Sequence, residues 1–241
     1  MTSNWLKADW PAPEFIQAGT TLRRGGVSKA PYDSFNLASH VGDELEAVEQ
    51  NRRLLNLPNA PQWLEQIHST AAVLLPCKDD IPKADASYTS KINTVCVVMT
   101  ADCLPVLITD KEGSCVAAIH AGWRGLCDGV IEATIKKLPA AAENLLVWLG
   151  PAIGPDVYEI GEEVYDAFTK RDNEAKRAFT VTSEQHWLFD IYHLAKLRLN
   201  RVGVDNIYGG EHCTLTEKED FFSYRRDGVT GRTASMIWIE K

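Results

Sequence analysis

Short apolar runs separated by polar turns predict a series of β-strands along the chain. Most of these runs are rich in valine, isoleucine and leucine, and several are apolar on both faces, as in strands that are buried on both sides. The predicted strands are Ala72–Leu75, Thr94–Met99, Leu104–Thr109, Cys115–His120, Leu145–Leu149, Asn206–Tyr208 and Thr233–Ile239. The short connection Thr100–Cys103 predicts a hairpin, so the sheet is not expected to be purely parallel.

Two segments have the pattern of amphipathic helices. Leu126–Leu138 follows a turn that contains glycine, and Ile191–Val202 has Asp190 as its N-cap and Gly203 as its stop. Strands interleaved with helices indicate an α/β protein, or an α+β protein with mixed sheets.

A further helix is predicted to begin after Asp43, with Asp43 as N-cap and Glu46 in the capping-box position. No repeat, low-complexity tract or long linker divides the chain. A single domain over residues 1–241 is therefore expected.

Composition and charge exclude several classes of partner. The 241 residues are 45% hydrophobic and 24% charged, as in ordinary globular proteins, and the formal net charge is −8. An acidic chain lacks the basic face that binding to nucleic acid requires, so no nucleic-acid partner is expected. No secretory signal pattern and no apolar run of membrane-spanning length occur, which predicts a cytoplasmic protein without a membrane partner. Six cysteines without a Cys-x-x-Cys pair fit a reducing compartment.

Two histidines and one cysteine stand where predicted strands begin or end, and they form a candidate metal site. Cys103 precedes one strand and His120 ends the next, so antiparallel pairing would bring them together, whereas His68 must come from a separate connection. Two imidazoles and a thiolate suit zinc or copper, and three protein ligands leave a fourth position for water or substrate. Without further evidence, each of these two histidines and this cysteine is more often a packed core residue than a metal ligand.

Eight segments of the chain, in order, resemble the YfiH family of bacterial proteins, also described as polyphenol oxidase or laccase-domain proteins. They cover nearly the whole length: Arg23-Arg24-Gly25-Gly26-Val27-Ser28, Pro31–Leu37, Trp63–His68, Ala84-Asp85-Ala86, Thr100–Val106, Ala118–Leu126, Gly150–Pro155 and Phe221–Asp227. The resemblance implies a four-layer α/β/β/α fold and a zinc site at His68, Cys103 and His120. It also implies phosphorolysis of adenosine, inosine and methylthioadenosine, and deamination of adenosine.

The chain departs from the usual pattern of this family in two places. It has Leu22-Arg23 where relatives usually have Thr-Arg, and His68-Ser69 where they usually have His-Gly. Neither change replaces a proposed ligand. Ser69 restricts backbone that glycine would leave free.

The two implied reactions require different groups beside the metal. Zinc with an open position lowers the pKa of bound water to about 7, which suits deamination, and Glu65 or Asp102 is the candidate for proton transfer. Phosphorolysis requires an anion site, for which Arg124 and Arg23 are the first candidates. Arg225 and Arg226 are the next candidates. Arginine also occurs at Arg52-Arg53 and Arg232.

Three other functions remain open from the sequence. A copper-dependent polyphenol oxidase would use a single copper, because six histidines are too few for the about ten that a multicopper cluster binds. A cysteine hydrolase or amidase that edits peptidoglycan precursors would use Cys103 with His120 and either Asp102 or Asp85. A nucleotide-binding module without turnover would stack a base on aromatic residues, for which the candidates are Trp63, Trp123, Tyr158 and Phe221. The oligomeric state is not predicted.

Overall fold

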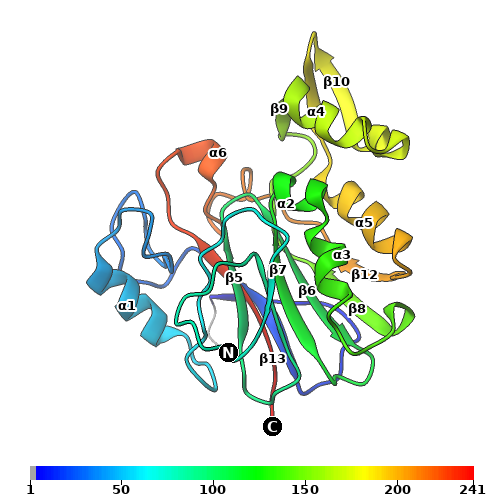
Figure 1. Cartoon of the computed structure of the whole chain (residues 1–241). Coiled ribbons are helices and arrows are strands. Elements are labelled where there is room, and N and C mark those ends of the chain that lie inside the picture. The colour runs from blue at the N-terminus through cyan, green and yellow to red at the C-terminus, as the bar shows by residue number, and fades with distance from the viewer. Residues whose placement is uncertain (1–3) are drawn as a thin grey trace.

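Two stacked β-sheets form the centre of the protein in a computed structural model that describes residues 4–241 (Figure 1). In these residues the four-stranded sheet has the order β1 (Trp5–Lys7), β2 (Ile16–Thr21), β13 (Thr233–Ile239) and β5 (Cys96–Thr100). The six-stranded sheet has the order β12 (Asn206–Gly209), β8 (Leu145–Leu149), β6 (Leu104–Asp110), β7 (Val116–Ala121), β4 (Ala86–Thr89) and β3 (Ala72–Leu74).

Both sheets contain strands that are buried on both faces, and this creates four layers. Alternate residues of β5 show how, because Cys96 and Val98 lie in the core between the sheets whereas Val97 and Met99 lie in the outer core. Helix α1 (Leu45–Leu54) lies on the side of the four-stranded sheet. Helices α2 (Trp123–Asp128), α3 (Val130–Ile135) and α5 (Ile191–Arg201) cover the six-stranded sheet (Figure 1). The expected four-layer α/β/β/α fold is confirmed.

A lobe of residues 159–189 projects beyond these layers, above α2 and α5 in Figure 1. It contains β9 (Glu159–Gly161), α4 (Glu162–Thr169), the 3-10 helix Asn173–Ala178, β10 (Phe179–Ser183) and β11 (His186–Phe189). Its strands form a separate antiparallel sheet in the order β10-β11-β9. Most of β10 is exposed, and such a strand lacks the apolar pattern that predicts the others.

The seven predicted strands are confirmed as β3, β5, β6, β7, β8, β12 and β13, with ends that agree or differ by at most two residues. The mixed pairing is also confirmed, since β12 runs parallel to β8 and β6 runs antiparallel to β7. The predicted hairpin at Thr100–Cys103 is wrong. β5 pairs with β13, and the chain crosses there from one sheet to the other. A short connection fits a corner between stacked sheets as well as a hairpin, and burial on both faces removes the pattern that would distinguish them.

The helix prediction is confirmed in one case and corrected in two. Asp190 caps α5, and its carboxylate accepts a hydrogen bond from the His193 amide at 2.8 Å. The predicted helix Leu126–Leu138 begins earlier, at Trp123, and Gly129 with a φ of 98° divides it into α2 and α3. Helix α1 has Glu44 as N-cap without a side-chain cap.

The carboxylate of Asp43 does not cap helix α1, contrary to the prediction, and has another role. It accepts hydrogen bonds from the Ser28 hydroxyl at 2.6 Å and from the Asn36 amide at 2.9 Å. It therefore ties the loops beside α1 together instead of capping the helix.

Two sequence-wide expectations concern the cysteines and the membrane. All six cysteines lie in the described part of the chain, and all are free thiols. Among residues 4–241, no helix combines the length and the apolar character needed to cross a membrane. The amino-terminal segment without a signal pattern begins with residues 1–3, which lie outside the described residues.

Shorter elements that the sequence pattern does not predict complete the chain. They include β1, β2, β4, the 3-10 helix Ala142–Asn144 and α6 (Tyr224–Asp227). Of these, helix α6 lies at the end of the stacked sheets, between α1 and α2 (Figure 1).

Candidate metal centre

Three segments meet at one end of the gap between the stacked sheets. In β7, Val116 and Ala118 face the core between the sheets, and His120 points to the same side because side chains alternate along a strand. Cys103 immediately precedes β6, where Leu104 pairs with Ala121 and Pro105 with His120. Antiparallel pairing therefore brings Cys103 and His120 together, as predicted.

His68 reaches the same point from the connection that precedes β3. The candidate ligand atoms of His68, Cys103 and His120 all lie within 4.8 Å of one another, and His68 Nε2 is 3.9 Å from Cys103 Sγ. The two imidazole rings meet edge to face, with centroids 4.7 Å apart. Ligands of tetrahedral zinc stand roughly 3 to 4 Å from one another, as follows from bond lengths of about 2.0 to 2.3 Å. The three residues thus fit a metal ion by donor type and by spacing.

Asp85 binds the side chain of His120 and the backbone that carries His68. One carboxylate oxygen lies 2.8 Å from His120 Nδ1 and also accepts the His68 amide at 2.9 Å. The other oxygen accepts the Ser69 hydroxyl at 2.8 Å, and the amides of Ser69 and Ile67 point to it too. Since an ionised carboxylate only accepts, Nδ1 of His120 carries a proton and Nε2 is left as the ligand atom.

The charges of the site favour the thiolate form of Cys103. Burial alone would raise the pKa of Cys103, but the positive charge of His120 and hydrogen bonds from both histidines outweigh it and lower this pKa to about 6. Burial would likewise raise the pKa of Asp85, but hydrogen bonds from His120 and Ser69 lower it to about 2. Burial would lower the pKa of His120, whereas the Cys103 thiolate and Asp85 raise it to about 9. Cys103 is thus a thiolate near neutral pH, the form that binds metals.

The backbone around His68 is held in a conformation that side chains seldom adopt. His68 has a φ of 58°, in the left-handed region. The three successive amides of Ile67, His68 and Ser69 compensate by converging on the Asp85 carboxylate. Ser69 itself is absent from the positive-φ residues of the described chain and contributes a hydroxyl to Asp85. Serine at this position therefore needs none of the backbone freedom that glycine would supply.

Gly122 is required for space and not for backbone freedom. A β-carbon there would lie 2.8 Å from the His68 ring and 3.0 Å from Cys103 Sγ. Replacing Gly122 with alanine is expected to displace both ligands and to weaken zinc binding by about tenfold or more. Competition with a chromogenic chelator measures this effect. Gly161→Ala is the matched control, since a β-carbon there meets no atom within 4 Å, and equal zinc affinities in the two variants would contradict the expected crowding.

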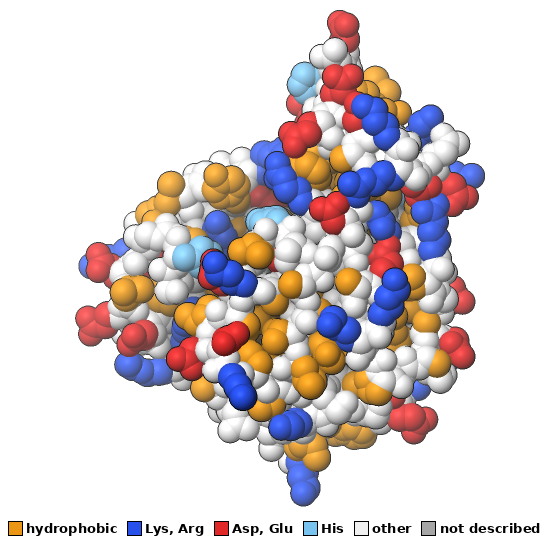
Figure 2. Space-filling model, in the orientation of Figure 1, with side chains coloured by type: hydrophobic (Ala, Val, Ile, Leu, Met, Phe, Trp, Pro, Cys, Tyr) orange, Lys and Arg blue, Asp and Glu red, His pale blue; other side chains and the backbone are white. Residues whose placement is uncertain are grey.

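The three candidate ligands line a pocket of about 380 Å³, within the range of small-molecule sites. The other lining residues are His40, Gln66, Met99, Thr100, Ala101, Tyr224 and Arg232. Figure 2 shows histidine side chains reaching the surface in the region between α1, α6 and α2. Gln66 is held in place by two hydrogen bonds to the backbone of Met99, at 2.7 and 2.8 Å.

Arg232 is the arginine that lines this pocket, and it stands one residue before β13. Its Nη1 donates to the carbonyls of Thr230 and Gly231, and its guanidinium lies over the Tyr224 ring, 5.7 Å from the centroid. Burial lowers its pKa, while the negative charges of Cys103 and Asp102 raise it. The sequence pattern does not single out Arg232, because no nearby motif marks it.

The predicted phosphate arginines lie elsewhere. Arg23 lines a different pocket, where its guanidinium donates to the carbonyls of Asp33 and Lys218. Arg124, in α2, is 3.5 Å from Glu163 and lies over the Trp123 ring. Arg225, one of the two further phosphate candidates, lies over the Tyr158 ring and donates to the Glu159 carbonyl.

Arg226, the other further phosphate candidate, donates to the carbonyls of Thr214, Leu215 and Phe221. It therefore supports the chain beneath α6.

The two predicted proton-transfer residues differ in their surroundings. Glu65 is half exposed and lies 3.6 Å from Lys83. Asp102 adjoins Cys103 and has a φ of 89°, and its carboxylate accepts hydrogen bonds from the Thr214 hydroxyl at 2.6 Å and the Arg225 amide at 2.7 Å. Asp102 thus connects the ligand loop to α6.

The four candidate stacking residues are not among the residues that line the metal pocket in the described chain. Phe221 is buried, and Trp63 packs on the outer core beneath Arg52. Tyr158 is close enough to Cys103 for the thiolate charge to raise its pKa further, after burial, which is the larger cause.

Comparison with known proteins places this geometry in context. Residues 17–240 match the family model described as multi-copper polyphenol oxidoreductase laccase. A Haemophilus influenzae protein named purine nucleoside phosphorylase is 52% identical over 98% of this chain and 99% of its own length. An Escherichia coli protein named purine nucleoside phosphorylase YfiH is 51% identical, with the same coverage of both chains.

Solved structures share the fold. A Neisseria meningitidis protein aligns with a TM-score of 0.94 and 47% identity over 99% of this chain and 100% of its own. YlmD from Geobacillus stearothermophilus aligns with a TM-score of 0.89 and 29% identity over 100% of this chain and 98% of its own.

Proposed function

The chain belongs to the multi-copper polyphenol oxidoreductase laccase family, and from that premise we propose that it is a zinc-dependent purine nucleoside phosphorylase. The substrates are adenosine, inosine and methylthioadenosine, and the products are the free base and a pentose 1-phosphate. The observation that carries the proposal is the convergence of His68, Cys103 and His120 in a pocket of small-molecule size. The names of the relatives support the substrate class.

Zinc fits this site better than a multicopper cluster does. The chain has six histidines, and in the described residues two of them share the candidate centre with a thiolate. A single copper could occupy the same ligands, because copper outranks zinc in intrinsic affinity. Phenol oxidation, the copper alternative, should then appear only after copper is added and vanish when zinc is restored.

The residues of the chain divide the work of phosphorolysis. When bound, the metal supplies a Lewis acid at the floor of the pocket. Arg232 holds the phosphate from the pocket wall. Arg124 is the second proposed phosphate cation; it lies outside the residues that line this pocket, on helix α2, which begins three residues after His120. Asp102 is the stronger proposal for proton transfer, because it adjoins Cys103 whereas Glu65 pairs with Lys83.

Replacing Arg232 with alanine is expected to raise the phosphate concentration for half-maximal rate by about 10- to 100-fold. A contact between arginine and a charged group is worth about 1.5–3 kcal/mol, which corresponds to that range. Initial rates of base release at varied phosphate measure it. Arg177→Ala, an exposed arginine of the lobe, is the matched control. A larger effect from Arg23→Ala than from Arg232→Ala would favour the arginine selected from sequence.

Adenosine deamination is a second proposed activity of the same pocket. The reaction brings only water and a neutral purine to the site, so it needs no arginine to bind phosphate. Arg232→Ala should therefore retain most inosine formation from adenosine while it loses base release. Equal losses of the two products would contradict the proposal that deamination does not depend on Arg232.

A cysteine hydrolase is the alternative that one observation favours. Cys103, His120 and Asp85 form a connected nucleophile, base and orienting carboxylate. Such an enzyme would act without metal on an amide substrate such as a peptidoglycan precursor. Activity that survives complete chelation would support it.

The experiment that tests the proposed function is a nucleoside panel assayed with and without phosphate. The expected result is base release that requires phosphate and forms pentose 1-phosphate in equal amount. Base release that is independent of phosphate would contradict phosphorolysis. Binding of nucleosides without any turnover would favour the nucleotide-binding module.

A further inference from the structure

His40 is a polar residue of the metal pocket that neither the candidate metal centre nor the fold uses. It stands in the connection between β2 and α1 and lines the pocket together with the three candidate ligands. Its side chain is exposed and makes no hydrogen bond, ion pair or ring contact with the described residues. It is also absent from the group of described residues that could hold a metal ion. Both nitrogens of its ring are therefore available to a bound molecule.

Arg232 lines the same pocket and also has donors without an acceptor. Its Nη1 donates to two carbonyls, whereas Nε and Nη2 have no hydrogen bond within residues 4–241. Neither atom is among the buried unpartnered atoms of the described chain, so both are accessible. Gln66, by contrast, uses both ends of its amide on the backbone of Met99. His40 and Arg232 are thus the nitrogen groups of this wall that remain for a ligand.

The charge around His40 is positive and has no carboxylate to balance it. Most arginines of the described chain form an ion pair with a carboxylate, and those that do not are Arg52, Arg177, Arg225 and Arg232. Arg177 and Arg225 are exposed, whereas Arg52 and Arg232 are half-buried. Burial, the charge of Arg232 and that of Arg52 together lower the pKa of the His40 imidazole. Two half-buried cations without a counterion favour an anionic ligand beside this ring.

Arg52 adds charge to this place without lining the pocket. Its Nε donates at 3.0 Å to the carbonyl of Leu37, which precedes His40 in the same connection. Glu49 raises its pKa, but burial lowers it more, and the Glu49 carboxylate pairs with Arg53. The contacts to an anion are therefore left to His40 and its neighbours in the pocket.

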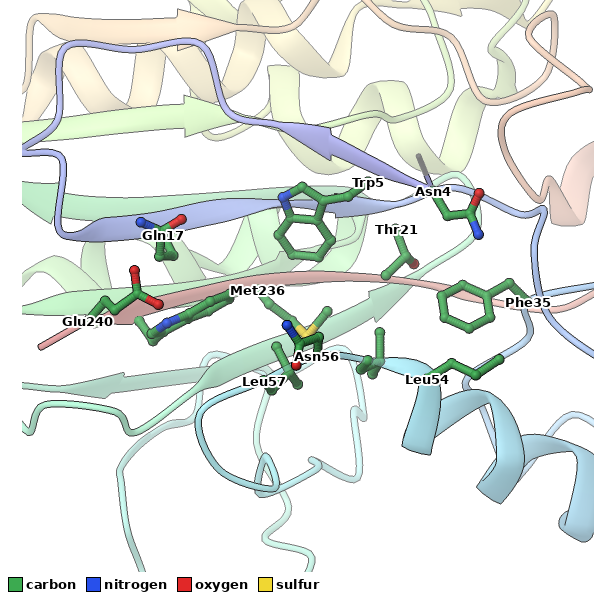
Figure 3. A pocket seen from close by; sticks show the side chains of 12 residues that line it. Asn4, Trp5, Gln17, Thr21, Phe35, Leu54, Asn56, Leu57, Met236 and Glu240 are labelled. Atoms are coloured by element: carbon green, nitrogen blue, oxygen red, sulfur yellow. The ribbon is translucent and has the colours of Figure 1, made fainter. Parts of the chain in front are cut away.

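Two other pockets have no arginine without a carboxylate partner among their described lining residues. The pocket on the outer face of the four-stranded sheet has a volume of about 320 Å³ and contains the carboxylate of Glu240 but no lysine, arginine or histidine (Figure 3). Another pocket is lined by Arg23, Arg24 and Arg226, and each of these pairs with an aspartate. An anion is therefore expected beside His40 and not in these pockets.

We propose that His40 is a phosphate-binding residue of the metal pocket and that it acts there with Arg232. The arginine offers two N–H groups to the phosphate oxygens, and a neutral imidazole offers one more. The inference deepens the proposed function and rests on it for the identity of the anion, because phosphorolysis brings phosphate to this pocket. Arg124, which is not among the described lining residues, is the competing candidate.

Direct binding tests this inference without turnover. The ring signals of His40 in the proton NMR spectrum of the zinc-loaded protein are assigned with His40→Gln. Titration with inorganic phosphate at constant ionic strength is expected to shift these signals along one saturable curve, and chloride should not shift them. If neither inorganic phosphate nor adenosine 5′-monophosphate shifts them, the inference fails, even where base release still requires phosphate.

Adenosine 5′-monophosphate distinguishes two sources of the phosphate group. Saturation of the His40 signals by inorganic phosphate supports the co-substrate of phosphorolysis. Saturation by the nucleotide alone would keep the phosphate site and contradict the proposed function, because the bound group would then belong to a phosphorylated substrate.

Three variants test the contact itself. His40→Ala is expected to raise the phosphate concentration for half-maximal binding and for half-maximal base release by about tenfold, and to leave that for inosine unchanged. His40→Gln keeps a neutral N–H donor and should recover most of the phosphate affinity. His193→Ala removes an exposed histidine of α5 and is the matched control. All three should keep their zinc, as elemental analysis would show.

Two results would overturn the inference. Equal losses of phosphate and inosine affinity in His40→Ala would show a general effect on the pocket. A loss of phosphate affinity in Arg124→Ala but not in His40→Ala would place the anion at α2.

Discussion

Replacing Cys103 with serine is expected to remove both the bound zinc and nucleoside turnover. The thiolate is the softest of the three ligands, and its charge balances His120 in a buried site. Loss of a supporting contact outside the ligand set already costs about 10- to 100-fold, so loss of a ligand should reduce activity by more than about 100-fold. Elemental analysis and initial rates on the same preparation measure the two effects together.

Cys77→Ser is the matched control for this experiment. Cys77 is also a half-buried free thiol, but its neighbours are Gln62 and Asp79 and not a histidine. The control should keep its zinc and its rate. Full zinc and full activity in Cys103→Ser would exclude Cys103 from the centre, whereas full zinc with no activity would favour a nucleophilic cysteine.

Replacing Asp85 with asparagine is expected to weaken zinc binding by about 10- to 100-fold, although Asp85 contacts no metal. The change removes the negative charge that fixes the proton on His120 Nδ1, and it also weakens the acceptor for the His68 loop. His120 would then be free to place its proton on the ligand nitrogen. Competition with a chelator measures the affinity, and excess zinc should restore much of the lost activity, which a catalytic role for Asp85 would not allow.

Asp110→Asn separates this effect from simple loss of stability. Asp110 is also buried, and it accepts hydrogen bonds from the Ser114 amide and hydroxyl and from the Cys115 amide. Its pattern repeats that of Asp85 with Ser69, but without a histidine. Both variants should unfold at lower temperature, and only Asp85→Asn should lose zinc. Equal zinc affinity in the two would assign Asp85 a purely structural role.

The parts of the fold that sequence predicts are those with a strong local pattern. The bounds of strands such as β8 and β13 agree with the prediction to the residue, because each is a continuous apolar run between polar turns. The division of strands into two sheets does not follow from the pattern. β5 and β6 are both buried on both faces, so the pattern is the same whether they pair with each other or lie in different sheets.

In the candidate site, too, only the features with a local sequence pattern could be predicted. Cys103 and His120 follow from strand ends that antiparallel pairing brings together. His68 is a candidate ligand by residue type, but no sequence pattern shows that its connection reaches the other two. The roles of Asp85 and Arg232 depend on distances between segments far apart in the chain, such as the 2.8 Å between His120 and Asp85, and no local pattern contains them. From sequence, Asp85 is a candidate only as a partner for a nucleophilic cysteine.

We propose that a zinc ion at His68, Cys103 and His120 is required for phosphorolysis of purine nucleosides. The most direct test removes the metal anaerobically, confirms its loss by elemental analysis, and restores zinc or copper before inosine is assayed with and without phosphate. We expect the metal-free protein to be inactive, zinc to restore phosphate-dependent release of hypoxanthine, and copper not to restore it. Full phosphorolysis by the metal-free protein, or restoration by copper alone, would contradict it.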